Sequence, residues 1–234
     1  MLLRVRVTLP DRPGALGQVA RTLGVAGADI VQVVVLERLG GRAVDDFTVV
    51  WPGAARVDRL MAGLAAIPGV QVDGVWKAIG APVSGGHDAE LLAQVAANPA
   101  DGLATLIDAV PGLLAADWAA AVVVPADWAS QPSVSEPTIA YASWRAPTPM
   151  QLPEVTPLRP RPMTGPDGTK YAVAPFGRAG LVLVIAREDD ASGTFHTTEV
   201  DRVGQLVRAA AVILGDRLDQ AGVPPVASAV TDPS

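Results

Sequence analysis

The chain of 234 residues is half hydrophobic, contains no cysteine and carries a formal net charge of -6. Its length suits one large domain or two small ones, and its apolar content is sufficient for a real core. Without cysteine, disulfides, thiolate catalysis and zinc–sulfur centres are excluded, and neither half is basic enough to indicate nucleic-acid binding.

The first eighty residues alternate between strand-like and helix-like patterns. Apolar residues at every second position from Leu3 to Leu9 predict a half-buried strand. Proline and glycine then mark the ends of the later elements. The expected elements are a strand at 3–9, a helix at 16–23, strands at 28–37 and 43–51, a helix at 57–67 and a strand at 70–77.

This βαββαβ order predicts a ferredoxin-like fold, in which a four-stranded antiparallel sheet has both helices on one face. The other face would then be bare. The apolar run from Val33 to Leu36 makes the strand at 28–37 apolar on both sides. We therefore expect the bare face or its edge to be covered, either by a second copy of the chain or by the rest of the same chain.

Residues 80–87 contain glycine, proline and serine and predict a flexible linker between a domain at 1–79 and a second domain at 88–221. The second domain is expected to be α+β with a central antiparallel sheet. A tail at 222–234 is expected to be disordered. The expected elements are helices at 88–97 and 103–110, strands at 118–124, 138–144, 171–175 and 181–187, and a long helix that starts with a capping box at Thr198.

The turn after the first strand, Asp11-Arg12-Pro13-Gly14-Ala15-Leu16, leads directly into a helix. The first amide groups of a helix have no partner within it and point at whatever lies before the helix. This turn is therefore suited to hold a small anion.

The same turn, together with Gly27-Ala28-Asp29-Ile30, resembles the ACT domain, whose members have a D-x-P-G-x-L turn and an Asn- or Asp-Ile pair at the start of the second strand. The resemblance covers the first eighty residues. It implies a regulatory module, often dimeric, that binds an amino acid between two copies. The ligand-binding residues that it implies are Asp11, Arg12, Pro13, Gly14, Ala15, Leu16, Asp29 and Ile30.

In that site the amides of Gly14, Ala15 and Leu16 would hold the ligand carboxylate, and Asp11 or Asp29 would accept hydrogen bonds from its ammonium group. Many family members have asparagine where this chain has Asp29. An ionised aspartate only accepts hydrogen bonds, whereas asparagine also donates, so the choice of ligand depends on this position.

Residues 88–220 resemble a GAF domain less closely. The resemblance rests on the strand Gly180–Arg187, on Phe195 and on the helix from Thr198 to Leu218. It implies a GAF-like domain in which a proline-rich segment replaces regular elements. The sequence has no chromophore cysteine and no cyclic-nucleotide signature.

Other polar residues have simpler interpretations. Asp45 and Asp46 lie next to each other in a strand, where neighbours point to opposite faces, so they are expected at the surface rather than as a metal pair. His196 lies near a helix start without a visible partner, which favours a capping or exposed histidine over an acid or base. No nucleophile–base–orienter set can be assembled.

No apolar stretch approaches the ~20 residues of a membrane span, and the chain does not start like a signal peptide. We therefore expect a cytoplasmic protein without membrane, nucleic-acid, metal or cofactor partners. The expected function is non-catalytic: a homodimeric regulatory sensor of a small molecule, most plausibly an amino acid. The alternative is a structural protein whose first module only dimerises and whose second domain contacts a partner.

Overall fold

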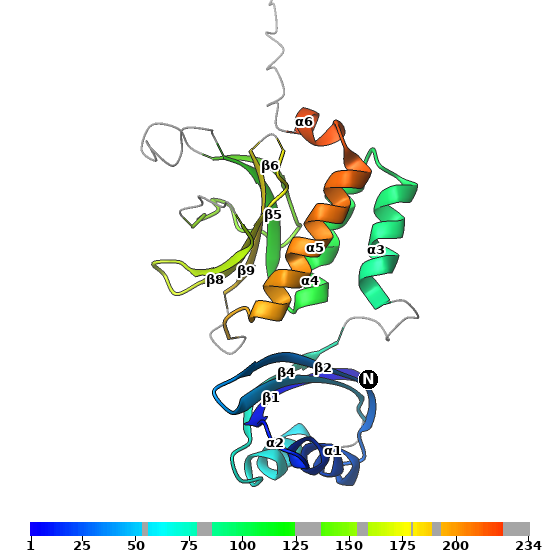
Figure 1. The fold of residues 1–234 in the computed structure, drawn as a ribbon, viewed down its shortest axis with the longest axis vertical. Coiled ribbons are helices and arrows are strands. Elements are labelled where there is room, and N and C mark those ends of the chain that lie inside the picture. Colours follow the sequence, from blue (N-terminus) through cyan, green and yellow to red (C-terminus); the bar gives the residue numbers. More distant parts are fainter. Residues whose placement is uncertain are drawn as a thin grey trace, which may run out of the picture.

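The computed structural model describes residues 1–52, 56–78, 86–124, 137–153, 159–178, 180–188 and 193–221. Within these ranges the chain is a mixed α+β protein with two antiparallel sheets, of four and five strands, and six helices. We call the part built on the four-stranded sheet the N-terminal unit and the part built on the five-stranded sheet the C-terminal unit. The N-terminal sheet lies between its own two helices and the C-terminal unit (Figure 1).

The N-terminal unit consists of β1 (Leu2–Pro10), α1 (Ala15–Val25), β2 (Asp29–Leu39), β3 (Arg42–Val50), α2 (Val57–Ala65) and β4 (Gln71–Lys77). Its strand order is β2-β3-β1-β4, and every neighbouring pair is antiparallel. The predicted order of elements and the predicted four-stranded antiparallel sheet are confirmed. β2 is an edge strand that pairs only with β3 among the described residues.

Apolar side chains of β1 and β3 point to one face of this sheet, which we call the helix-covered face. Val5 pairs with Phe47, and both side chains are fully buried. They belong to the same apolar cluster as Leu23 of α1 and Leu64 of α2. Both helices therefore pack on one face, as the alternating pattern predicts.

The C-terminal unit contains α3 (Gly86–Ala97), α4 (Gly102–Leu114), β5 (Trp118–Val123), β6 (Thr138–Ala142), β7 (Arg161–Thr164), β8 (Lys170–Pro175), β9 (Leu181–Arg187), α5 (Thr197–Leu214) and α6 (Arg217–Ala221). Its strand order is β6-β5-β9-β8-β7. β9 is buried along its whole length, as expected for a central strand. Helices α3, α4 and α5 cover one face, where their apolar side chains share a core with the sheet.

Several boundaries differ from the sequence prediction. α3 begins at Gly86, inside the predicted linker, because the helix takes up the last two residues of that segment. Residues 79–85 and the tail at 222–234 lie outside the described residues.

α4 continues through Pro111, where an end was expected, because a proline removes only one helical bond and continuation buries Leu114. β7 was not predicted, because it contains Pro162, which an edge strand tolerates.

The second face of the N-terminal sheet, which we call the opposite face, is covered by the C-terminal unit (Figure 1). Arg4 donates a hydrogen bond to the carbonyl of Leu113 at the end of α4, and Arg6 donates one to Glu199 in α5. The sequence left two possible covers for this face, a second copy of the chain or the rest of the same chain. In the structure, the rest of the same chain covers it. The edge of β2 stays free, with Val33 and Val35 exposed by 39% and 46%.

Among the described residues, no helix has both the length and the apolar character that crossing a bilayer requires.

Candidate functional site

A cavity of about 510 Å³ lies at the turn between β1 and α1, on the helix-covered face. We call it the turn cavity. The turn supplies one wall and the ends of β2 and β3 supply the other. Its lining residues are Leu9, Pro10, Asp11, Arg12, Pro13, Gly14, Leu16, Val35, Arg38, Ala43 and Asp45.

Gly14 ends the turn and is the N-cap residue of α1, with φ of 87°. A side chain is strained at this φ, so glycine lets the chain enter the helix at this angle. In the described part of the chain, the amides of Leu16 and Gly17 have no hydrogen-bond acceptor. The start of α1 therefore presents free N–H donors, with the positive end of the helix dipole behind them.

Asp45 of β3 supplies a buried carboxylate to the turn cavity. Its side chain lies on the helix-covered face beside Ala43 and Phe47, and the residue is only 3% exposed. Its Oδ1 has no hydrogen-bond partner within the described residues. Burial raises the pKa of Asp45, and the nearby charges of Asp11 and Asp46 add to this, while the Arg38 guanidinium opposes it.

The expectation that Asp45 and Asp46 are surface residues is wrong, because each is buried on a different face of the sheet.

Arg38 of β2 closes the cavity beside the turn. Its Nη2 lies 2.7 Å from Oδ1 of Asp11, in an ion pair that is largely open to solvent. An arginine carries five N–H donors, so this pair leaves Arg38 able to bind a second acceptor. The ion pair also links the turn to β2.

These groups are complementary to a small zwitterion. Free amides of α1 and the guanidinium of Arg38 can bind a carboxylate. The unpaired oxygen of Asp45 can accept a hydrogen bond from an ammonium group. That group would also supply a positive charge to balance the buried carboxylate. The apolar part of the wall, Val35 and Ala43, is left to contact a short side chain.

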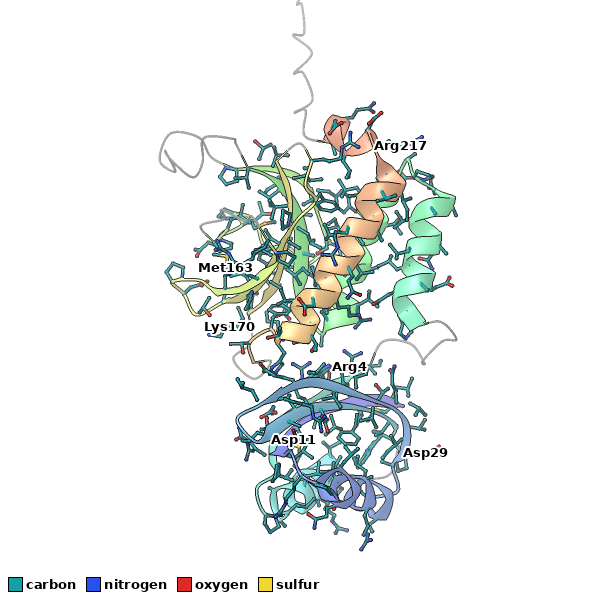
Figure 2. All side chains as sticks on the ribbon, in the orientation of Figure 1. Arg4, Asp11, Asp29, Met163, Lys170 and Arg217 are labelled. Atoms are coloured by element: carbon teal, nitrogen blue, oxygen red, sulfur yellow. The ribbon has the colours of Figure 1, made fainter. Side chains whose placement is uncertain are left out.

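The structure brings together five of the eight residues predicted for the ligand site: Asp11, Arg12, Pro13, Gly14 and Leu16. Ala15 is buried in the core beneath the turn. Asp29 and Ile30 begin β2 and lie at its other end, about 30 Å from Arg38 at the usual rise per residue. Figure 2 labels Asp11 and Asp29 at separate places in the N-terminal unit.

Sequence reasoning missed Arg38 and Asp45. A signal for Asp45 was present, because Asp45 alternates with the apolar residues Ala43 and Phe47 and so shares their face of the strand. An acidic residue at a core position of a strand indicates a site or a buried partner. Arg38 had no such signal, because a bulge in β2 changes its register between Val35 and Glu37.

The opposite face carries a buried ion network behind the cavity. Arg6 binds Asp46 through two hydrogen bonds, of 2.7 and 2.9 Å, and binds Glu199 of α5 at 2.9 Å. Glu199 also binds Arg187 of β9 at 2.6 Å. Burial alone would raise the pKa of Glu199, but the charges of Arg187 and Arg6 outweigh burial and hold it below its ordinary value. The network therefore joins the two sheets through paired charges.

His196 is the N-cap residue of α5, so the capping role expected for it is confirmed, two residues before the predicted capping box at Thr198. Its amide donates to Glu199 at 2.9 Å. Its ring also has a partner that the sequence did not reveal, because Nδ1 lies 2.9 Å from Oε2 of Glu37 in β2. His196 and Glu37 are not among the residues that line the turn cavity, and their contact joins β2 to the start of α5.

Comparisons with known proteins add little to this geometry. No protein-family model and no curated protein sequence matches the chain. A solved structure titled as that of an unknown protein from Galdieria sulphuraria is 13% identical, with a TM-score of 0.30 over 91% of this chain and 90% of the other. That similarity is too low to support an argument about fold or function.

Proposed function

We propose that the protein is a non-catalytic regulatory sensor that binds an amino acid in the turn cavity. The observation that carries this proposal is the buried carboxylate of Asp45, which has an oxygen without a partner, in the lining of a cavity whose other donors suit a carboxylate. The cavity volume of about 510 Å³ is in the range of small-molecule sites. In this proposal the N-terminal unit is an ACT domain with a ferredoxin-like fold and the C-terminal unit is GAF-like.

The proposal includes a homodimer formed through β2. Two β2 edge strands that pair antiparallel about a two-fold axis would extend the sheet and bury Val33 and Val35 of both copies. Antiparallel pairing also places the start of one strand beside the end of the other. Asp29 of the partner subunit would then lie near Arg38 and the turn cavity, which would reunite the two separated parts of the predicted site.

The ligand would act on the C-terminal unit through the two strands that line its cavity. Successive residues of β2, Glu37 and Arg38, contact His196 on one face and the cavity on the other. A ligand that draws Arg38 or Asp45 toward itself would also move the groups that bind α5. Such a ligand would shift the equilibrium between two arrangements of the units, because it binds one arrangement better than the other.

A thermal-shift screen of the twenty amino acids against the full chain tests the proposal. A ligand of the folded state at a concentration 100-fold above its Kd raises stability by about 2.7 kcal/mol, which corresponds to about 5–10 °C for a chain of this size. Calorimetric titration of each hit then gives its Kd and stoichiometry. The amino-acid proposal fails if none of the twenty changes the melting temperature at 10 mM.

The second candidate function is a structural one, in which the N-terminal unit only dimerises and the C-terminal unit contacts a partner. The exposed valines of β2 favour it, because they support a dimer without any ligand. Gly14→Ala and Asp29→Ala separate the two. Loss of amino-acid binding with an intact dimer supports the sensor, whereas loss of the dimer in a protein that binds no amino acid supports the structural role.

A further inference from the structure

A second cavity, of about 630 Å³, lies between the two units on the side of β4. We call it the inter-unit cavity. Arg4 of β1 together with Trp76 and Lys77 of β4 form its wall on the N-terminal sheet. The C-terminal unit supplies the other walls from α3, α4, α5 and the turn that holds Trp144 and Arg145. This cavity is separate from the turn cavity, since they lie on opposite faces of the same sheet.

Arg4 carries a charge that the surrounding protein does not neutralise. Four arginines lie at the contact between the units: Arg4, Arg6, Arg187 and Arg202. Three carboxylates pair with the last three of them: Asp46, Glu199 and Asp88.

For Arg4 itself, the described residues provide only one long hydrogen bond, of 3.4 Å, to the Leu113 carbonyl. Burial lowers the pKa of Arg4. The negative charge of Asp46 opposes this, while the positive charges of Arg202 and Arg6 lower the pKa further. A partly buried guanidinium without a carboxylate partner favours the binding of an anion.

Trp76 also lines this cavity and has an unsatisfied donor of its own. It pairs with Arg4 across the β1–β4 ladder, so the two side chains leave the sheet on the same face. The indole Nε1 of Trp76 is buried and has no acceptor within the described residues. An indole nitrogen only donates hydrogen bonds. A single negatively charged acceptor would therefore suit both Arg4 and Trp76.

We propose that the inter-unit cavity binds a small molecule through a single anionic head, a carboxylate or a phosphate, which accepts hydrogen bonds from Arg4 and Trp76. The cavity lining holds four cationic side chains (Arg4, Lys77, Arg145 and Arg202) and three carboxylates (Glu90, Asp108 and Asp117), and this near balance suits a single anionic head better than a polyanion. Trp144 lines the cavity and is 83% exposed, with the Arg145 guanidinium 4.9 Å from its ring centroid, so its ring offers apolar surface to the rest of the ligand. The head would lie between the units, near Arg4 (Figure 2).

Nuclear magnetic resonance of the indole N–H groups tests this site without knowledge of the natural ligand. Acetate and inorganic phosphate are titrated separately to 50 mM at constant ionic strength, with chloride as the balancing anion. The Trp76 indole signal is assigned by its absence in Trp76→Phe. A bound head moves this signal downfield with saturation, and the stronger of the two probes identifies the head as carboxylate or phosphate.

Matched variants separate this site from general salt effects and from the turn cavity. Arg4→Gln should weaken the response at least tenfold, whereas Arg21→Gln, an arginine on α1, and Asp45→Asn should leave it unchanged. If Arg4→Gln does not fold, Arg4→Lys keeps the charge and should retain a weaker, saturable response. The proposal is overturned if neither probe moves the Trp76 signal, or if Arg4→Gln responds as the unmodified chain does.

Discussion

Asp45 and Asp46 are consecutive residues of β3, yet each serves a different part of the protein. Asp45 lines the turn cavity and has a buried oxygen without a partner, while Asp46 forms two hydrogen bonds with Arg6 in the network that reaches Glu199 of α5. Glu37 and Arg38 of β2 repeat this arrangement. Neighbouring residues of a strand point to opposite faces. In both β3 and β2, a residue that lines the turn cavity is therefore next in sequence to a residue that contacts the C-terminal unit or its network.

Loss of the Glu199 charge should destabilise the chain strongly. Glu199→Gln keeps the shape of the side chain but leaves Arg6 and Arg187 without their shared carboxylate, and breaking a buried ion pair costs about 3–5 kcal/mol. Urea unfolding at pH 7 measures the change. Glu90→Gln, on an exposed face of α3, is the control and should change stability by less than about 0.5 kcal/mol. Equal stability of the two variants would show that the network does not hold the units together.

The same carboxylate predicts how stability depends on acid. The folded pKa of Glu199 lies below its ordinary value of 4.5, because the charges of Arg187 and Arg6 outweigh burial. Its contribution to stability is therefore present above about 4.5 and is lost as pH falls through the folded pKa. Urea unfolding from pH 7 to pH 3 should show the unmodified chain losing more stability than Glu199→Gln. Parallel curves would contradict the assignment.

Asp45 should have the opposite effect in the unliganded protein. Burial raises its pKa, so the stability that it contributes is full below its ordinary value of 3.8 and is lost as pH rises through the folded pKa. Asp45→Asn should therefore raise the melting temperature of the free protein at pH 7 by about 2–4 °C, the shift produced by about 1 kcal/mol. Calorimetric scans at pH 7 and pH 4 measure it, and the gain should shrink at the lower pH. A lower melting temperature for Asp45→Asn at pH 7 would mean that the ionised carboxylate has a partner.

The free edge of β2 predicts a dimer that a single charge disrupts. Val33 is 39% exposed on the helix-covered face and would lie at the centre of an antiparallel β2 pair. Val33→Lys should convert the dimer to a monomer, because a buried lysine without a partner is unfavourable. Light scattering after size exclusion gives the mass. Val212→Lys, at an exposed position of α5, should leave the dimer intact. A monomeric mass for the unmodified chain would contradict the proposed dimer.

The N-terminal fold could be predicted from the sequence because its signals are local. Alternation from Leu3 to Leu9 and the turn at Pro13-Gly14 identify a strand, a turn and a helix within short windows. The apolar run of β2 indicated that a sheet face needed a cover; the face is covered, yet Val34 of this run stays 41% exposed. What covers it could not be predicted, because Arg6 and Glu199 lie 193 residues apart and neither has a local signal for the other.

The candidate site was predictable only in part, for the same reason. The turn residues Asp11 to Leu16 form one wall of the turn cavity from a single short segment. Asp45 and Arg38 reach the cavity only through strand pairing and, for Arg38, a bulge in β2. β7 was missed because its proline argues against a strand unless the strand is at an edge, and the edge position depends on the whole sheet.

The most direct measurement is calorimetric titration of the best amino acid from the screen into the unmodified chain, Asp45→Asn and the control Asp58→Asn. A charged hydrogen bond of about 1.5–3 kcal/mol predicts that Asp45→Asn raises the Kd by roughly 10- to 100-fold. Asp58 lies on the exposed surface of α2, so its variant should bind as the unmodified chain does. An unchanged Kd in Asp45→Asn would contradict the claim that the buried carboxylate of the turn cavity holds the ligand ammonium.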